Sequence, residues 1–548
     1  MKSMLISRIL FCISFTFLTN FTFAEEPETA WEITESGTTL TLSDGTGWVF
    51  KLTSQGVLSR SSSGTATVLN FRSCVLPDGY EIKKFSSSQN YPFMGKSKVI
   101  QELYWPDTLT EITHSAFREC TALTICDFPE NSKITSVQNL AFYKDAALVE
   151  LTLVCDDLTT IGSEAFNGAS LKKLTIKAPN LKTVGTSAFN GNSQMVVNAE
   201  DIIPPSLTSI GNSAFKTCKK IAGKISLSNI SGTLGTAAFH SCIGITEIEI
   251  VSEKLTAIGD TAFYGCTSCA SVTLNCPNLT SIGGLAFSPA QTGETTNLKK
   301  IEYNCPKVTT FADGVFTGNA AVSMDIAKII HPGVTRIGNN SFRYCRKMYG
   351  KVYLPKVTSI GSQAFYYAVS IQEFETGETL ASLGEHAVQY CYALTNVILR
   401  GSSLAKISGC TFYNSNKIKR FELFAPLLSA VSVESNGQAF NNVKPEKIYI
   451  HSAPFVSADG SLDNTQSVVD GILYAVSQVA STADKAKACN IYVPKKNLAD
   501  WKKYSSALLD YEPKHAPRRT FGVWRESSRK AYLVSLPQAV LGAAVYLR

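Results

Sequence analysis

A short alternation of apolar and polar positions recurs along most of the chain. Residues 207–218 read LTSIGNSAFKTC, residues 255–266 read LTAIGDTAFYGC and residues 357–368 read VTSIGSQAFYYA. The frame is L-x-x-I-G-x-x-A-F-x-x-C-x-x-L-x-x-I-x-L, and its phenylalanine returns every 23 to 29 residues. A period of this length predicts one structural unit repeated about fourteen times. The marker positions are Phe117, Phe142, Phe166, Phe189, Phe215, Phe239, Phe263, Phe287, Phe316, Phe342, Phe365, Val388, Phe412 and Phe440.

Each unit predicts two extended segments joined by a turn. The closing segment, as at 171–176 and 245–250, alternates apolar and polar residues, which is typical of a strand. The opening L-x-x-I-G segment is also extended, and its glycine fits a bend with positive φ. The S/T-x-A-F segment between them predicts a short helical or 3₁₀ turn. These glycines are Gly162, Gly185, Gly211, Gly235, Gly259, Gly283, Gly338, Gly361 and Gly384.

A unit of this size cannot bury its own apolar side chains, so its stability must come from stacking against the next unit. Stacking would place the closing strands in one long parallel sheet and the Ala-Phe pairs in one internal column. The alternative, a series of separate small domains, is disfavoured because no linker separates the repeats.

The repeat resembles that of the BspA-like leucine-rich repeat family, and the resemblance covers residues 109–450. It implies a right-handed leucine-rich-repeat-like solenoid with a long parallel β-sheet, short turns or 3₁₀ segments on the other side, and small β-rich caps. It also implies an exported or cell-surface protein, for which adhesion or host-protein binding is proposed in some members. The sequence departs from the pattern at Val388, in the 287–316 interval and over 428–447.

The segments outside the repeats have their own patterns. Residues 1–24 carry Lys2 and Arg8 before an interrupted apolar run, which predicts a secretory signal peptide; a membrane anchor is the alternative, but the run is short for a spanning helix. Alternation around Asp44-Gly45 predicts an N-terminal β-rich cap over 25–108.

The C-terminal side predicts an irregular segment and cap over 451–513, then a basic tail over 514–548. Within the cap we expect a strand at Tyr492 and Val493 and a short helix with Leu498, Trp501 and Tyr504 on one face. Residues 531–547 read as a docked strand or an ill-ordered tail.

The net charge of +7 lies mostly outside the repeats. The leader supplies two positive charges and residues 514–548 supply six, so the body is close to neutral. A neutral body lacks the basic stripe that neutralises phosphates, and we expect no nucleic-acid partner.

The cysteines follow the repeat rather than a disulfide framework. Six of them lie three residues after the marker position, and three more share a second column, so we favour buried free thiols over disulfides. The single C-x-x-C, Cys266 and Cys269, also falls on core positions, which disfavours a zinc or redox site. The two columns are Cys120, Cys218, Cys242, Cys266, Cys345 and Cys391, then Cys155, Cys276 and Cys305.

Other chemistry is not indicated. The six histidines share no column, and neither nucleophile-elbow, phosphate-loop nor zinc-protease motifs occur. The paired acids on the strands are better explained as solvated charge than as glycosidase carboxylates. The sequence therefore predicts a non-enzymatic protein with no catalytic, cofactor-binding or metal site.

The remaining candidate is the outward face of the closing strands. Charges of both signs and threonines on a long curved face suit a protein or glycan ligand. We therefore expect a secreted or cell-surface, adhesin-like protein that binds a macromolecule through this face and has no transmembrane segment once the leader is removed. The alternative is a structural or scaffolding protein of the cell envelope. The candidate binding residues are Lys173, Thr175, Glu247, Glu249, Lys300, Glu302, Glu373, Glu375, Arg420 and Glu422.

Overall fold

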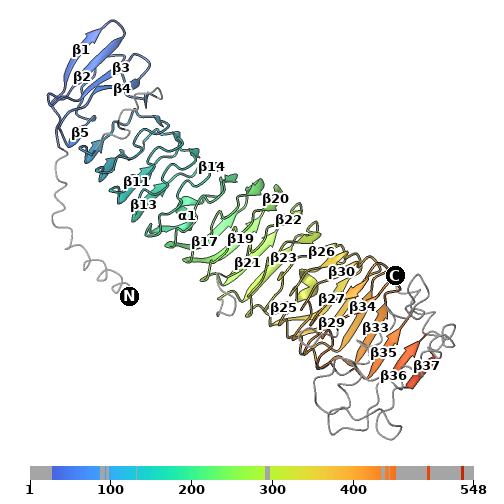
Figure 1. Cartoon of the computed structure of the whole chain (residues 1–548). Helices are drawn as coiled ribbons and strands as arrows, with labels where there is room; N and C mark the ends of the chain where they lie inside the picture. The colour runs from blue at the N-terminus through green and yellow to red at the C-terminus, as the bar shows by residue number, and fades with distance from the viewer. Residues whose placement is uncertain are drawn as a thin grey trace, which may run out of the picture.

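The computed structural model is a long, gently bent rod of stacked coils (Figure 1). It describes residues 27–86, 93, 98–130, 132–289, 297–432, 438–443 and 445–451, and the backbone of 490–493 and 532–535. Most coils contribute one short strand and one longer strand, so two rows of parallel strands run along the rod, and each row is divided into several hydrogen-bonded sheets. The parallel β-solenoid predicted from the repeats is confirmed.

The N-terminal end is an antiparallel meander. Its strands are β1 (Glu32–Ser36), β2 (Thr39–Ser43), β3 (Val49–Thr53) and β4 (Val57–Ser62). β4 then pairs in parallel with β6 (Lys84–Phe85), so the meander covers the first edge of the short-strand sheet. β6, the first short strand, is thereby paired on both sides and is not an open edge. The signal peptide predicted over 1–24 lies outside the described residues, and the division at residue 109 stays a prediction.

The short strands come from the opening segments of the repeats. They are β8 (Glu111–Ile112), β10 (Ser136–Val137), β12 (Thr160–Ile161), β14 (Thr183–Val184), β16 (Ser209–Ile210), β18 (Gly232–Leu234), β20 (Leu255–Ile258), β22 (Ser281–Ile282), β24 (Thr310–Phe311), β26 (Arg336–Ile337), β28 (Ser359–Ile360), β30 (Ser382–Leu383), β32 (Lys406–Ile407) and β34 (Ala430–Val431).

The longer strands come from the closing segments. They are β5 (Val68–Asn70), β7 (Glu102–Tyr104), β9 (Ile125–Asp127), β11 (Glu150–Val154), β13 (Lys173–Lys177), β15 (Val197–Asn198), β17 (Ile221–Leu227), β19 (Ile245–Val251), β21 (Ser271–Asn275), β23 (Lys300–Asn304), β25 (Met324–Asp325), β27 (Met348–Leu354), β29 (Ile371–Thr376), β31 (Asn396–Arg400), β33 (Arg420–Phe424), β35 (Lys447–Ile450), β36 (Asn490–Val493) and β37 (Tyr532–Ser535).

Helical structure is nearly absent from the described residues. One four-residue helix, α1 (Ala199–Ile202), and one 3₁₀ turn, η1 (Ile326–Lys328), interrupt the coils. The A-F segments form short hydrogen-bonded turns, as the fold predicted from the repeats requires, and the helical form of the turn does not occur in them. The strand expected at Tyr492 and Val493 is β36, which pairs with β35. The helix expected at Leu498, Trp501 and Tyr504 lies outside the described residues.

The marker phenylalanines form a continuous internal stack. From Phe117 to Phe365 the ring centroids of neighbours lie 4.9 to 5.8 Å apart and the planes differ by at most 25°. Val388 interrupts the stack, which resumes between Phe412 and Phe440. The backbone reinforces it, because Phe215 N–H donates to the Ala238 carbonyl of the next coil at 2.8 Å. Neighbouring coils are therefore bonded in the turn as well as through their strand pairs.

The repeated glycine is required for a different reason than the one predicted. None of the nine opening-segment glycines has a positive φ. At Gly235 a Cβ atom would lie 2.3 Å from the Gly211 carbonyl carbon, so the glycine permits close approach of adjacent coils. The left-handed residue comes two positions later, as at Ala237 with φ of 55°, whose N–H donates to Asp260 O at 2.8 Å.

Replacing Phe263 by Ala should destabilise the solenoid locally by about 3–5 kcal/mol, because it removes a buried ring that packs on two others. Urea unfolding and amide exchange of the coils around Phe263 measure the loss. Tyr264→Ala is the matched control, since this neighbouring ring is half-buried and lies outside the column. Equal effects of the two substitutions would contradict the role of the stack.

Candidate functional site

Two columns of side chains line the outer face of the long-strand sheet. The register places Lys224, Glu247, Ser271 and Lys300 opposite one another, and two residues further along each strand it aligns Ser226, Glu249, Thr273 and Glu302. Period-two alternation explains the pattern, because the residues between them point into the core. The same columns continue on the later strands as Lys351, Glu373, Asn396, Arg420 and Lys447, and as Tyr353, Glu375, Ile398, Glu422 and Tyr449.

Eight of the ten candidate residues fall on these columns. Lys173 and Thr175 pair with Glu150 and Thr152 in a separate two-stranded sheet, β11 and β13. A binding role for the ten residues stays a prediction. The eight are Glu247, Lys300, Glu373 and Arg420, and Glu249, Glu302, Glu375 and Glu422.

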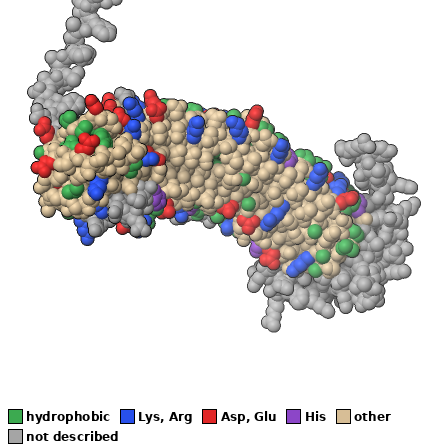
Figure 2. All heavy atoms as spheres, turned by 90° about the horizontal axis from the view of Figure 1, so that it is seen from above, with side chains coloured by type: hydrophobic (Ala, Val, Ile, Leu, Met, Phe, Trp, Pro, Cys, Tyr) green, Lys and Arg blue, Asp and Glu red, His purple; other side chains and the backbone are tan. Residues whose placement is uncertain are grey.

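Basic and acidic side chains are interspersed along the length of the molecule on the face that Figure 2 presents. On the sheet face the two signs pair with each other. Lys224 Nζ lies 3.2 Å from a Glu247 carboxylate oxygen and 3.0 Å from one of Glu249. Hydrogen bonding to Lys224 lowers the pKa of Glu249. Exposed pairs of this kind add little stability. This part of the face therefore consists of solvent-exposed charges of both signs.

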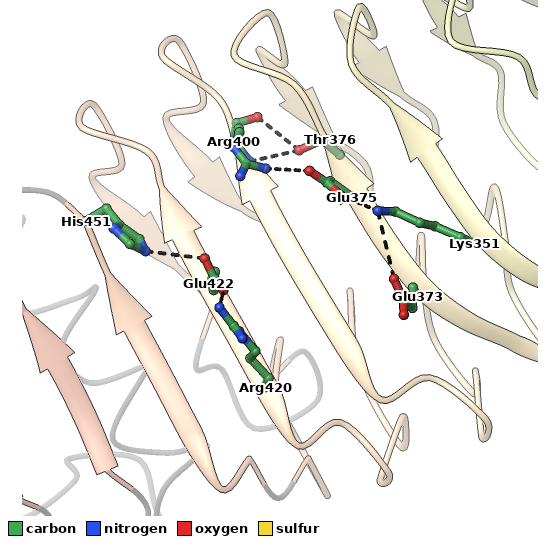
Figure 3. Close-up of polar contacts among 8 residues, drawn as sticks. All are labelled: Lys351, Glu373, Glu375, Thr376, Arg400, Arg420, Glu422 and His451. Carbon is green, nitrogen blue, oxygen red and sulfur yellow. Dashed lines mark hydrogen bonds and ion pairs between the residues drawn. The ribbon is translucent and has the colours of Figure 1, made fainter. Parts of the chain in front are cut away.

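The C-terminal part of the face carries a denser network (Figure 3). Lys351 Nζ lies 2.6 Å from one Glu375 oxygen, and Arg400 Nη1 lies 2.7 Å from the other. Thr376 holds the Arg400 backbone, since its hydroxyl donates to the Arg400 carbonyl at 3.0 Å and accepts from the Arg400 N–H at 2.9 Å. The Glu375 side chain is only 16% exposed, so this carboxylate is positioned from two sides.

Glu422 differs from the solvated charge that the sequence predicted. Its side chain is 7% exposed and it contacts Arg420 and His451, with His451 Nε2 at 3.4 Å. Burial acts to raise the pKa of Glu422, but the nearby His451 and Arg420 side chains outweigh it, so the pKa lies below its usual value. The His451 ring stacks on Phe424 with centroids 3.7 Å apart. The final strands of the face are therefore tightly packed.

The first cysteine column caps backbone carbonyls. Cys218 Sγ and Cys242 Sγ each donate to the carbonyl of the marker phenylalanine one coil earlier, at 3.0 Å. Other coils meet the same need with Asn192, Asn319 and Ser415, whose side chains donate to Phe166, Phe287 and Val388. The sequence frame concealed this equivalence because the residue types differ. Their common signal is a small hydrogen-bond donor three residues after the marker.

The C-x-x-C pair is structural. Cys266 Sγ donates to Phe239 O at 3.3 Å and Cys269 Sγ donates to Ser271 O at 3.2 Å. Burial raises the pKa of the Cys269 thiol to about 11. Within the described part of the chain, no three His, Cys, Asp or Glu side chains gather as a metal would need, and no helix is long and apolar enough to span a bilayer.

Comparison with known proteins settles the family. A model of the BspA type leucine-rich repeat region matches residues 70–196, 198–323 and 321–444, in six copies. The chain belongs to the BspA-type leucine-rich repeat family. The resemblance predicted from the repeats is confirmed, and the BspA-type match begins ahead of residue 109, at the level of β5.

Solved structures similar to this BspA-type chain are distant in sequence. A leucine-rich repeat protein from Bacteroides ovatus is 20% identical, with 72% of this chain and 93% of that chain covered and a TM-score of 0.41. A leucine-rich cell surface protein from Faecalibacterium prausnitzii is 15% identical, with 80% and 93% covered and a TM-score of 0.30. The pneumococcal vaccine antigen PcpA is 14% identical, with 87% and 96% covered and a TM-score of 0.25. No protein with a curated description matches the chain.

The thiols should be unreactive in the native protein. All thirteen described cysteines are free, and burial raises the pKa of Cys345 and Cys391 to about 12. We expect little modification by a thiol reagent before unfolding. In denaturant without reductant, all fifteen cysteines of the chain should react, or fourteen if the leader with Cys12 is removed. A shortfall after denaturation would reveal disulfides.

The Glu422 carboxylate should stabilise the fold in a pH-dependent way. Because its folded pKa is lowered, its contribution is present above the ordinary carboxyl pKa and is lost as pH falls through the folded value. The denaturation midpoint of Glu422→Gln should lie below that of the wild type at neutral pH, and the difference should disappear as pH falls through the folded pKa of Glu422. Glu150→Gln, at an exposed pair with Lys173, is the control. A deficit that is unchanged at acid pH would point to packing instead of charge.

Proposed function

We propose that this chain is a cell-surface, adhesin-like repeat protein that binds a macromolecular partner, most directly a protein, through the long-strand face of β27 to β35. The predicted leader over 1–24 and the BspA-type repeats support placement at the cell surface. The proposal assigns no catalytic step to the chain.

The observation that carries the proposal is the charge network centred on Glu375. Lys351, Arg400 and Glu375 are held in one arrangement before any partner arrives, which reduces the entropy lost on binding. Tyrosines flank the network: Tyr349 is 46% exposed and Tyr353 is 40% exposed. Tyrosine and arginine are the side chains that contribute most at protein interfaces.

Mixed charge also indicates the class of partner. The columns alternate Lys351, Glu373 and Arg420 instead of presenting one sign. A surface with both signs complements another protein surface and selects its orientation, whereas nucleic-acid binding requires basic side chains that neutralise many phosphates.

The test is binding of the full chain to immobilised fibronectin, fibrinogen, laminin and collagen by surface plasmon resonance. Arg400→Glu places a negative charge beside Glu375 and should weaken a wild-type interaction about tenfold or more. Lys406→Glu is the matched control, because Lys406 is an exposed base at the same level of the rod on the short-strand sheet. Equal loss in both variants would reject the long-strand face. Absence of wild-type binding, combined with an altered envelope in cells that lack the protein, would favour the scaffolding role.

A further inference from the structure

A second surface lies on the turns between the two sheets. Six tyrosines from four successive coils form one connected cluster, the tyrosine ladder. Ring centroids lie 5.5 Å apart for Tyr344 and Tyr367, 4.3 Å for Tyr367 and Tyr390, and 5.7 Å for Tyr390 and Tyr413. The rings are partly exposed, and Tyr392 is 37% exposed. The members are Tyr344, Tyr366, Tyr367, Tyr390, Tyr392 and Tyr413.

Three of these tyrosines occupy the left-handed position of the turn. Tyr344, Tyr367 and Tyr390 lie two residues after the marker and have φ of 61°, 58° and 59°. Other coils fill this position with glycine, as at Gly168 and Gly191, or with other residues in the same conformation, such as Lys144 and Thr217. The left-handed turn is therefore common to the coils, and the three tyrosines differ by their large rings and by the contacts between those rings.

Two arginines add positive charge to the ladder. The Arg343 guanidinium lies 4.9 Å from the Tyr344 ring centroid and 5.3 Å from that of Tyr366. The Arg346 guanidinium lies 5.6 Å from Tyr344 and 5.7 Å from Tyr367. No ion pair joins either arginine to a carboxylate within the described ranges. Stacking on the tyrosine rings therefore orients the two guanidinium groups, and no carboxylate of the described residues neutralises their charge.

An open hollow of about 640 Å³ adjoins the ladder at Arg343. Its lining includes Asp313, Arg336 and Asn340. Among the described residues, Arg343 Nε and Asn340 Oδ1 are buried and have no hydrogen-bond partner. Buried polar atoms without partners are uncommon and mark places where a ligand can bond. The hollow thus offers donors and acceptors beside an aromatic platform.

We propose that the tyrosine ladder, with Arg343 and Arg346, binds a linear acidic polysaccharide. The apolar faces of sugar rings stack on tyrosines, which combine a flat apolar body with a polar hydroxyl. Carboxylate or sulfate groups bond to the guanidinium groups in the bidentate geometry that arginine favours. The hollow takes sugar hydroxyl groups. This site is separate from the long-strand face and does not depend on the function proposed for it.

The repeated geometry favours a polymer of repeated units. Equivalent tyrosines return once per coil and are aligned by backbone bonds, such as Tyr344 N–H to Tyr366 O at 2.8 Å and Tyr390 N–H to Tyr413 O at 2.9 Å. A single-stranded nucleic acid also stacks on aromatic rings, so an oligonucleotide is the competing polyanion that the test must include.

The test uses affinity electrophoresis and calorimetry of the full chain with polygalacturonate, heparin, neutral dextran and a single-stranded oligonucleotide. The double variant Tyr367→Gly and Tyr390→Gly has glycine at a position where other coils also have glycine. We expect it to fold normally while it lacks two of the stacking rings. We expect affinity for an acidic polysaccharide to fall about tenfold or more. Arg343→Gln with Arg346→Gln should remove the preference for acidic over neutral polymer. Comparison of polygalacturonate with heparin identifies the anionic group.

The control is Arg400→Glu on the long-strand face, which should retain wild-type polysaccharide binding, so the two proposals fail independently. Melting curves identify any variant that is misfolded. Wild-type affinity in the double glycine variant would overturn the proposal. Absence of binding to both acidic polymers, equal binding to dextran, or binding to the oligonucleotide alone would overturn it as well.

Discussion

Contact between successive coils is the interaction on which the whole molecule depends. A single coil of this size exposes nearly as much apolar surface as it can bury, so it gains its core only when neighbours cover both of its sides. The phenylalanine stack, the close approach at glycine and the backbone bonds in the turn all serve this contact. Each outward surface inherits its regularity from them, since a side chain at a given position returns once per coil.

The sequence predicted those parts of the fold that repeat. Periodicity alone located Phe215, Phe239 and Phe263 in one internal column, and alternation alone placed Glu247 and Glu249 outward on one strand. These predictions succeeded because burial acts identically in every coil. The role of Gly235 was predicted incorrectly, because a pattern shows that glycine is needed but does not distinguish a positive φ from a close backbone approach.

The features that escaped prediction are those that differ between coils. The burial of Glu422 depends on neighbours such as His451, which lies beyond the regular repeats. The equivalence of Cys218, Asn192 and Ser415 was hidden by residue type. The tyrosine ladder was visible as Tyr366-Tyr367 in the sequence, but only the coil-to-coil alignment shows that these rings meet Tyr344 and Tyr390. In a regular solenoid, the specific features thus come from the residues that depart from the repeat.

Val388 is the exception within the column itself. The aromatic stack stops at this coil, and the short-strand sheet is interrupted between β30 and β32, as it also is between β16 and β18. The long-strand sheet and the turn hydrogen bonds nevertheless run through the coil, as from Val388 N–H to Thr411 O at 2.9 Å. At this coil, strand pairing and backbone bonds therefore carry the coupling that aromatic rings share elsewhere, and the array tolerates the loss of one ring without a break in its backbone connections.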